Sequence, residues 1–319
     1  MYAIGFRHGW TKSAGWPIGE AKTMKFTNTL VGIVLPVMIA GALAAAPASA
    51  ATSSDSAIDA LQRLGLLSSS ADMTLPQNTK SAASSSLTTN SLHVESEAGN
   101  ISISPVTATS GTVSANRAVS VLAGPSASFV LARQSAGAQA NAAYVVLHNE
   151  SAPVEYRFQI TANDRPAVLS LVDGRILVSD QNGEPVNVIG SAWAVDANGN
   201  QVATAYAVDG DVLIQSVVPA ESTAYPVVAD PRVQCDVVWC TIEFTRTETN
   251  TASQTAAAAS AVLCAGAGLL NPIVGFVCGA YGAAFWVAAV QAKNTGQCVG
   301  FRMLTIGGSA HPVIIGCYA

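Results

Sequence analysis

The sequence predicts an all-β antiparallel sandwich followed by a small disulfide-stapled α+β domain with a helical hairpin. Three observations support this prediction. Short runs of β-branched residues alternate with turn dipeptides between about 93 and 231. No charged residue occurs from Thr249 to Ala292, a stretch rich in Ala. All six cysteines lie at or beyond Cys235.

Residues 1–50 are typical of a secretory signal peptide. Lys22 and Lys25 form a basic region, and the uncharged apolar run Leu30–Leu43 follows it. This run is shorter than the roughly 20 residues that a membrane-spanning helix needs, so a removed signal is favoured over a retained anchor. The natural start is expected at Met24, because a signal that begins there has an ordinary length.

The end of the signal is predicted from small side chains. Ala48 and Ala50 occupy the two positions that a signal peptidase reads, and Pro47 ends the apolar helix before them. Cleavage is therefore expected between Ala50 and Ala51, which gives an exported, extracellular mature protein.

Residues 51–92 form a segment rich in Ser, Ala and Thr without aromatic residues. Such a composition buries too little apolar surface to offset the entropy of ordering, so a disordered tether or pro-segment is expected. One short amphipathic helix is predicted over Asp55–Leu67, ending at Gly65. Its apolar face would hold Ile58, Leu61 and Leu64.

The β-sandwich is predicted over 93–231. The clearest strand patterns are Tyr144–Leu147, Val154–Ile160, Val168–Val172 and Arg175–Ser179. The turns are predicted at Asp173-Gly174, Asn182-Gly183, Asn198-Gly199 and Asp209-Gly210. Asn-Gly and Asp-Gly supply the positive φ angles of tight hairpins, and turns spaced roughly ten residues apart favour an antiparallel sandwich.

The cysteine-rich domain is predicted over 232–319. Cys235–Phe244 has the pattern of a strand or tight hairpin, and Cys298–Ala319 that of two short strands. Between them, one helix is expected over about Thr251–Gly266 and a second over Pro272–Ala292, joined by the breakers Gly268 to Pro272. Together these two helices would form a hairpin.

An even number of clustered cysteines in an exported chain favours disulfides, and the chain has no C-x-x-C pair that would favour zinc. Cys264 and Cys278 lie at equal distances from Asn271 in the predicted turn, so they are expected to pair. The remaining four cysteines allow three pairings. The short-range set is preferred: Cys235 with Cys240, and Cys298 with Cys317.

Four segments carry a family resemblance: Gly190–Gly199, Val202–Tyr206, Asp209–Gln215 and Tyr225–Pro231, which reads YPVVADP. Over about 140–319 the chain resembles an uncharacterised family of secreted actinobacterial proteins whose sandwich ends in this motif. The Ala-rich hairpin with cysteines is similar to the tail that often follows. The chain departs from the pattern at Ala192, where a proline often stands. The resemblance implies fold and compartment, and no catalytic residue.

Catalytic and ligand-binding patterns are sparse. The sequence shows no nucleophile elbow, metalloprotease motif or Gly-rich phosphate loop, so neither an enzyme nor a cofactor is expected. The mature chain keeps His93, His148 and His311, and a Ser/His148/Asp triad is only imaginable, because a triad is recognised by geometry. Asp196–Asn200 begins like a calcium loop but lacks its later residues, so a plain turn and no metal are expected. Trp193, Trp239 and Trp286 are expected in the core.

The function predicted from the sequence is therefore a non-catalytic secreted or cell-surface protein that binds a partner or an envelope component. The acidic balance of 51–230 argues against nucleic-acid binding. The alternative is a membrane-active, bacteriocin- or toxin-like effector that contacts the membrane through 251–292, where Gly275 and Gly279 form a G-x-x-x-G pair. A hydrolase is the residual alternative.

Overall fold

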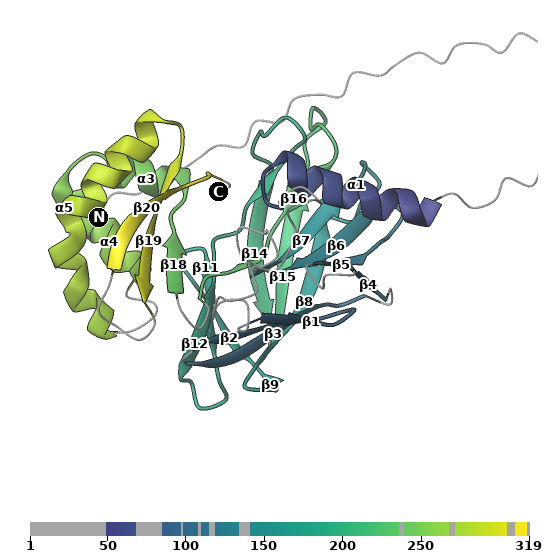
Figure 1. Ribbon diagram of the computed structural model, residues 1–319, viewed down its shortest axis with the longest axis horizontal. Coiled ribbons are helices and arrows are strands. Elements are labelled where there is room, and N and C mark those ends of the chain that lie inside the picture. Colours follow the sequence, from purple (N-terminus) through teal and green to yellow (C-terminus); the bar gives the residue numbers. More distant parts are fainter. Residues whose placement is uncertain are drawn as a thin grey trace, which may run out of the picture. The chain divides into compact units, whose positions relative to one another are not determined.

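The protein is described by a computed structural model (Figure 1). The residues described are 49–67, 85–96, 98–107, 110–114, 119–133, 141–235, 239–267, 272–304 and 310–317. All of them belong to one compact unit, Ala46–Ala319. The predicted signal sequence up to Ala48 lies outside the described residues, and so do 68–84 of the predicted tether.

Seven of the described strands form a first sheet, here called sheet A. Their order is β1 (Ser85–Leu87), β2 (Leu92–Ser96), β3 (Gly99–Pro105), β8 (Glu155–Ala162), β15 (Val212–Val218) and β14 (Ala203–Asp209), with β9 (Arg165–Pro166) paired to β8. All of these pairings are antiparallel. Because β1 and the first residue of β2 precede His93, the β-region begins earlier than the sequence predicted.

Ten described strands form sheet B. The main path is β10 (Val168–Val172), β11 (Arg175–Ser179), β12 (Pro185–Ile189), β17 (Arg232–Val233), β7 (Asn141–Leu147), β6 (Ala127–Ala132), β5 (Val119–Leu122) and β4 (Thr112–Val113). Beside it, β16 (Val227–Ala229) pairs with β7 and with β13 (Ala194–Val195). Since β17 belongs to this sheet, the sheet continues past the predicted boundary at residue 231.

The hairpin from β10 to β11 shows how local sequence fixes this topology. Both strands have the predicted bounds, and Asp173-Gly174 joins them with φ angles of 48° and 78°. Two successive positive φ values define a type I′ turn, whose twist matches that of the flanking strands. Glycines of the other three predicted turn dipeptides also have positive φ values. The mostly antiparallel β class is thus confirmed.

The two sheets share one apolar core. Sheet A contributes side chains such as Ile103 and Leu213, and sheet B contributes Val145 and Ile176. Phe129 of β6 and Phe158 of β8 meet edge to face, with 5.6 Å between their ring centroids. This contact joins the sheets directly, and such pairs stabilise a core beyond the area they bury.

Helix α1 (Ser49–Arg63) packs on the other face of sheet B. Leu61 is fully buried there against β-strand residues such as Val130 and Tyr144. Strand β7 is consequently buried at all positions, which explains its continuous apolar run. The interpretation of 51–67 as an unpacked tether is therefore wrong: the sheet supplies the apolar surface that the helix alone lacks.

The end of α1 matches the sequence prediction. Gly65 has a φ of 68°, the amide of Gly65 donates to the carbonyl of Gln62 (2.9 Å), and that of Leu66 donates to Leu61 (2.9 Å). These two bonds form a Schellman motif, in which glycine takes the left-handed conformation and satisfies the last carbonyls. The helix begins at Ser49, earlier than the predicted Asp55, so that Ala50 and Ala51 lie in its first turn.

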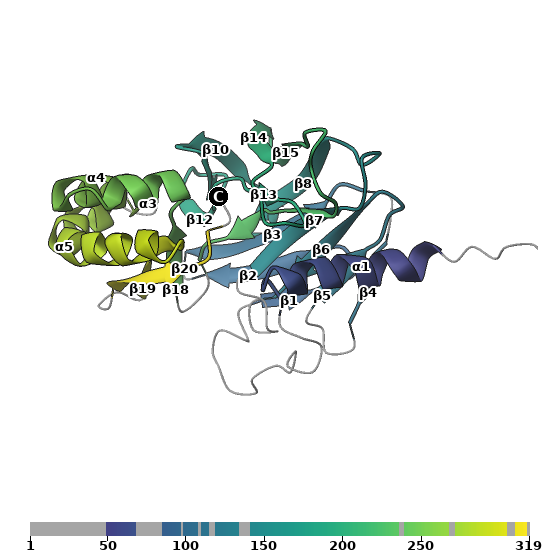
Figure 2. The same cartoon turned by 90° about the horizontal axis from the view of Figure 1, so that it is seen from above.

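The C-terminal part contains a third antiparallel sheet, β18 (Trp239–Glu243), β19 (Cys298–Leu304) and β20 (Ala310–Ile315). It packs against α3 (Arg246–Ala252), α4 (Ala256–Ala267) and α5 (Pro272–Asn294) (Figure 2). Phe244, Leu263, Phe285 and Phe301 form its core. Helices α4 and α5 contact each other closely: a Cβ on Gly282 would lie 1.9 Å from the Ser260 hydroxyl.

Helix α3 was not predicted, and α4 begins later than the predicted Thr251. A capping box explains α3: the Thr245 side chain accepts from the Glu248 amide, and the Glu248 side chain accepts from the Thr245 amide. The helix ends at Ala252 with Ser253 as its C-cap, and the Thr255 hydroxyl then caps α4 by accepting from the amide of Ala258 (3.0 Å). Short polar caps thus divide what composition alone presents as one helix.

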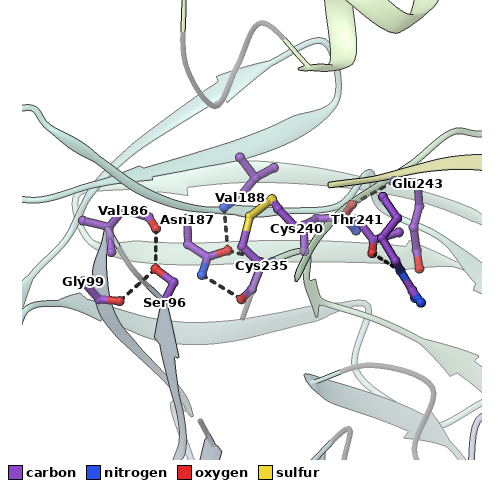
Figure 3. The surroundings of a disulfide bond; sticks show 11 residues. Ser96, Gly99, Val186, Asn187, Val188, Cys235, Cys240, Thr241 and Glu243 are labelled. Atoms are coloured by element: carbon purple, nitrogen blue, oxygen red, sulfur yellow. Dashed lines mark hydrogen bonds between the residues drawn. A yellow bond between two sulfur atoms is a disulfide. The ribbon is translucent and has the colours of Figure 1, made fainter. Parts of the chain in front are cut away.

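Two of the three expected disulfides are described: Cys235–Cys240 and Cys298–Cys317. Both are the preferred short-range pairs. Cys264 is also disulfide-bonded, whereas the side chain of its predicted partner Cys278 lies outside the described residues. Figure 3 shows the Asn187 side chain facing Cys235, where it donates to the Cys235 carbonyl (3.1 Å).

Candidate functional site

A cleft of about 430 Å³ lies along one side of strand β14. Thr204, Ala205 and Tyr206 of β14 form one wall, and Leu171 and Asp173 at the end of β10 lie across from it. The remaining wall comes from Ser191 and Ala192, and from Thr245, Thr247 and Glu248 at the start of α3. Strands β10 and β14 are neighbours in space, as Figure 2 shows. The cleft therefore lies between the outer strands of the two sheets.

Asp230 holds the β14 wall from inside. Its side chain is fully buried and accepts three hydrogen bonds: from the Trp193 amide (3.0 Å), the Gln215 side chain (2.8 Å) and the Tyr206 hydroxyl (2.6 Å). Gln215 also donates to the Thr204 hydroxyl (3.2 Å). One carboxyl group thus fixes Tyr206 directly, Thr204 through Gln215, and the loop before β13 through Trp193.

The electrostatics of this network are unusual. Burial raises the pKa of Asp230 to about 7, although the three hydrogen bonds and nearby Arg232 oppose the shift. Burial next to Asp230 also raises the pKa of Tyr206 well above its ordinary value. Sequence reasoning missed this role of Asp230. The available signal was a single carboxyl group directly after the apolar run of β16.

Arg175 holds the opposite wall. Its side chain is 1% exposed and forms an ion pair with Glu248. The guanidinium donates to both carboxylate oxygens of Glu248 (3.0 Å each) and to the Glu243 carbonyl (2.9 Å), and it lies 5.3 Å from the Phe244 ring centroid. Because this pair is bidentate, it sets orientation as well as distance.

Glu248 connects this ion pair to the start of α3, since it also accepts from the Thr245 amide at 2.7 Å. A second pair, Arg232 with Glu243 (2.7 Å), joins sheet B to β18. The C-terminal wall is therefore fixed to sheet B through two ion pairs. The sequence placed Arg175 on a strand, but nothing local indicated that its partner lies beyond residue 240.

The polar groups of the cleft are hydroxyls and carboxylates. Ser191, Thr204, Thr245 and Thr247 provide the hydroxyls. Of the two carboxylates, Glu248 is paired with Arg175, whereas Asp173 lies exposed in the β10–β11 turn. Among the described residues that line the cleft, none is Lys, Arg or His. The cleft therefore suits a ligand that donates hydrogen bonds or carries positive charge.

The histidines are not brought together. His93 lies in β2, His148 follows β7, and His311 lies in β20. The Ser128 hydroxyl and the His148 Nε2 are 2.8 Å apart, and burial lowers the pKa of His148. Ser128 is fully buried, and no carboxylate of the described residues is hydrogen-bonded to His148. This pair does not have the geometry of an accessible nucleophile.

Asp196 acts within its own turn. Its Oδ1 accepts from the amides of Asn198 (2.9 Å) and Asn200 (2.8 Å), and its Oδ2 from the Asn200 side chain (3.1 Å). Burial alone would raise the pKa of Asp196, but the bonds from Asn200, Ala224 and Asn198 together bring it below its ordinary value. The predicted turn is present, and the carboxylate closes it.

The three tryptophans differ in their surroundings. Trp193 is buried beside Tyr144, as predicted. Trp239 is half-buried between the Arg302 guanidinium and the His311 ring. Trp286 is 37% exposed, so its assignment to the core is wrong. The inward face of α5 carries Phe285, and the next residue is rotated by about 100° away from it.

Comparisons of the chain with protein-family models, with curated proteins and with solved structures found no match. The cleft along β14 is lined by the residues named above. Its two anchors, Asp230 and Arg175, are the functional candidates that the geometry adds to those of the sequence.

Proposed function

We propose that the chain is a non-catalytic secreted or cell-surface protein that binds a partner or an envelope component in the cleft along β14. The observation that carries this proposal is an open cleft of about 430 Å³ whose walls are held by buried polar anchors. Its volume lies within the range of roughly 300–1,000 Å³ typical of ligand sites. Walls that are already fixed reduce the entropy that binding must overcome.

Export forms part of the proposal. The disulfides Cys235–Cys240 and Cys298–Cys317 are of the kind that persists in oxidising compartments. Together with the signal pattern of 1–50 and the expected cleavage before Ala51, they favour an extracellular protein. The proposed architecture is a sandwich of sheets A and B, followed by an α4–α5 helical hairpin, in a secreted actinobacterial family.

A binding role fits the groups in the cleft better than catalysis. Glu248, one of the two carboxylates, already uses both oxygens in bonds to Arg175 and the Thr245 amide. The hydroxyls of Thr204 and its neighbours have no imidazole beside them in the cleft lining. Hydroxyl nucleophiles need an adjacent base, whereas hydroxyls that bind a ligand do not.

The test is the binding of labelled mature protein, 51–319, to isolated polysaccharide, protein and lipid fractions of the envelope. Ala205 is exposed and lines the cleft, so Ala205→Arg should weaken binding at least about tenfold by filling it. Ala220→Arg, at an exposed turn position outside the cleft lining, is the matched control. Equal binding by both variants, or no binding by the unchanged protein, would refute the proposal.

A second candidate function rests on α5. Val287 is 60% exposed and Trp286 37%, on a helix without charge up to Lys293. Such a surface suits the boundary of a lipid bilayer. Among the described residues, no helix is both long enough and apolar enough to span a membrane. If this surface acts on membranes, the oxidised protein should release dye from vesicles, and W286S/V287S should abolish release. We expect no release.

A further inference from the structure

Strand β14 is an outer strand of sheet A with a regular backbone. Among the described strands it pairs only with β15, over seven consecutive residue pairs without a bulge. The pair Asp209–Val212 closes a two-residue turn, so these residues exchange hydrogen bonds. The backbone groups of Ala207, Ala205 and Ala203 then also face β15, because every second residue does.

The backbone groups of Thr204, Tyr206 and Val208 consequently face away from β15. The hydrogen bonds of β15 agree with this assignment. Val217, which lies opposite Thr204, donates its amide to the Val154 carbonyl on the β8 side (2.8 Å) and so faces away from β14. Within the described residues, no other segment donates to or accepts from these outward backbone groups of β14. Two of these residues, Thr204 and Tyr206, also line the cleft.

This edge lacks the usual protection against strand pairing. Natural edge strands are shortened, bulged, or interrupted by Lys or Pro. Of the other strands that end sheets A and B, β1 has three residues, β4 two and β10 five. Strand β14 has seven residues, with neither Lys nor Pro, and small exposed side chains at Ala203, Ala205 and Ala207. An open edge beside a cleft is the geometry of strand addition.

We propose that β14 binds an extended, basic polypeptide segment of a partner as an additional antiparallel strand, with side chains of that segment entering the cleft. This inference rests on the proposed binding function and names its partner class. Extended peptides gain affinity from backbone hydrogen bonds and specificity from alternate side chains, which are the two elements present here.

The charged groups near β14 favour a basic segment as the added strand. Asp173 at one end of the cleft and Asp211 at the β14–β15 turn have no ion-pair partner among the described residues. Asp209 is paired with Arg157, and Glu248 with Arg175, so the unpaired charges are negative. A second copy of this acidic chain would bring like charges together. A segment with Lys or Arg complements them.

The experiment uses the secreted, oxidised mature protein and acetylated peptides of about eight residues with alternating Val and Lys. A peptide with Glu in place of Lys is the charge control and should bind at least about tenfold more weakly. Two further peptides carry backbone N-methyl groups on alternate residues, in complementary patterns. One pattern should abolish binding and the other should not, because only every second amide of an added strand donates to β14.

Two protein variants localise the binding. Ala205→Arg should abolish it, and the surface control Ala220→Arg should retain it. Asp173→Asn is the milder variant, because Asn tolerates the positive φ of 48° at this position. It should weaken binding of the Lys peptide about threefold and should not weaken binding of the Glu peptide, because it removes one exposed negative charge.

Different outcomes separate this inference from the proposed function. If both N-methyl patterns bind, or if Ala205→Arg binds the Lys peptide normally, strand addition at β14 is refuted. If the envelope fractions bind in a manner that depends on Ala205 while no peptide does, the binding function stands and the strand inference fails. If neither fractions nor peptides bind, both fail.

Discussion

Two buried ionisable residues determine the shape of the cleft. Asp230 accepts hydrogen bonds from Trp193, Tyr206 and Gln215. Arg175 donates to the Glu243 carbonyl and forms an ion pair with Glu248. Buried charged groups are costly unless their partners are complete, and both residues have several. Removal of one partner should therefore cost more than a surface substitution does.

The protonation of Asp230 should make stability depend on pH. Its pKa in the folded protein is raised to about 7, above its ordinary value, so the folded state binds a proton that the unfolded state has already released. The free energy of unfolding should then fall as pH rises towards 7, by roughly 3 kcal/mol between pH 5 and pH 8, and level off above that. Urea unfolding at several pH values measures this.

The matched variant is Asp230→Asn, which keeps a polar side chain of the same size and cannot titrate. The difference between its pH profile and that of the unchanged protein isolates the Asp230 contribution from all other groups. Parallel profiles would show that Asp230 is not protonated near neutral pH.

Glu248→Ala should destabilise the protein by about 3 kcal/mol, because it leaves Arg175 buried without its carboxylate and removes the capping box of α3. The control is Arg246→Ala in the same helix. Arg246 is exposed and donates one long hydrogen bond, to the Gly296 carbonyl at 3.4 Å, so its loss should cost less than about 0.5 kcal/mol. Denaturant unfolding compares the two, and equal losses would contradict the structural role of the ion pair.

At the scale of helices and strands, the sequence predicts the features that depend on neighbouring residues, such as turns and helix ends. Strands β10 and β11 were predicted to the residue because a type I′ dipeptide joins two alternating runs, and α1 ends at the predicted Gly65 motif. The docking of α1 was not predictable, because its partner surface lies on β5 to β7, far along the chain. Helix α3 depends on a capping box that the Ala-rich composition obscured.

The same distinction between local sequence and contacts of distant segments applies to the cleft along β14. The turn that places Asp173 follows from its dipeptide, and Tyr206 and Asp230 both lie in segments that the family resemblance singled out. The network between them could not be predicted, since Asp230 and Gln215 approach only when β15 and β16 are placed in their sheets. Arg175 and Glu248 likewise lie on two elements, β11 and α3, that are far apart in the sequence.

The role of α1 can be tested at this scale. Leu61 is fully buried against sheet B, so Leu61→Ala should lower the free energy of unfolding by roughly 2–4 kcal/mol. Arg63→Ala, at an exposed position on the same helix, is the control and should change it little. If Leu61→Ala proved as stable as the control, the helix would be a detachable tether after all.

For the whole molecule, all the described residues belong to one unit, and the ion pair between Arg175 and Glu248 joins segments that sequence analysis assigned to separate domains. A cleft between such segments keeps its shape only while they stay together. The disulfides favour an oxidising compartment, which is consistent with export and with a partner outside the cell.

Export through a signal peptide predicts a defined N-terminus for the mature protein. Mass spectrometry of protein from culture supernatant should find Ala51 as the first residue, because Ala48 and Ala50 fit the cleavage rule. An intact product in the membrane fraction that begins at Met1 or Met24 would instead identify Leu30–Leu43 as an anchor.

Site-specific photo-cross-linking in the native culture tests the central claim, binding at the β14 cleft, most directly. A photoreactive amino acid replaces Ala205 in the cleft, Ala220 as the surface control, or Val287 on α5. The proposed function predicts a discrete adduct at Ala205 and none at the other two positions, and strand addition further predicts that mass spectrometry identifies the adduct as polypeptide. An adduct at Val287 with none at Ala205 would contradict the claim and favour membrane or partner contact through the helix.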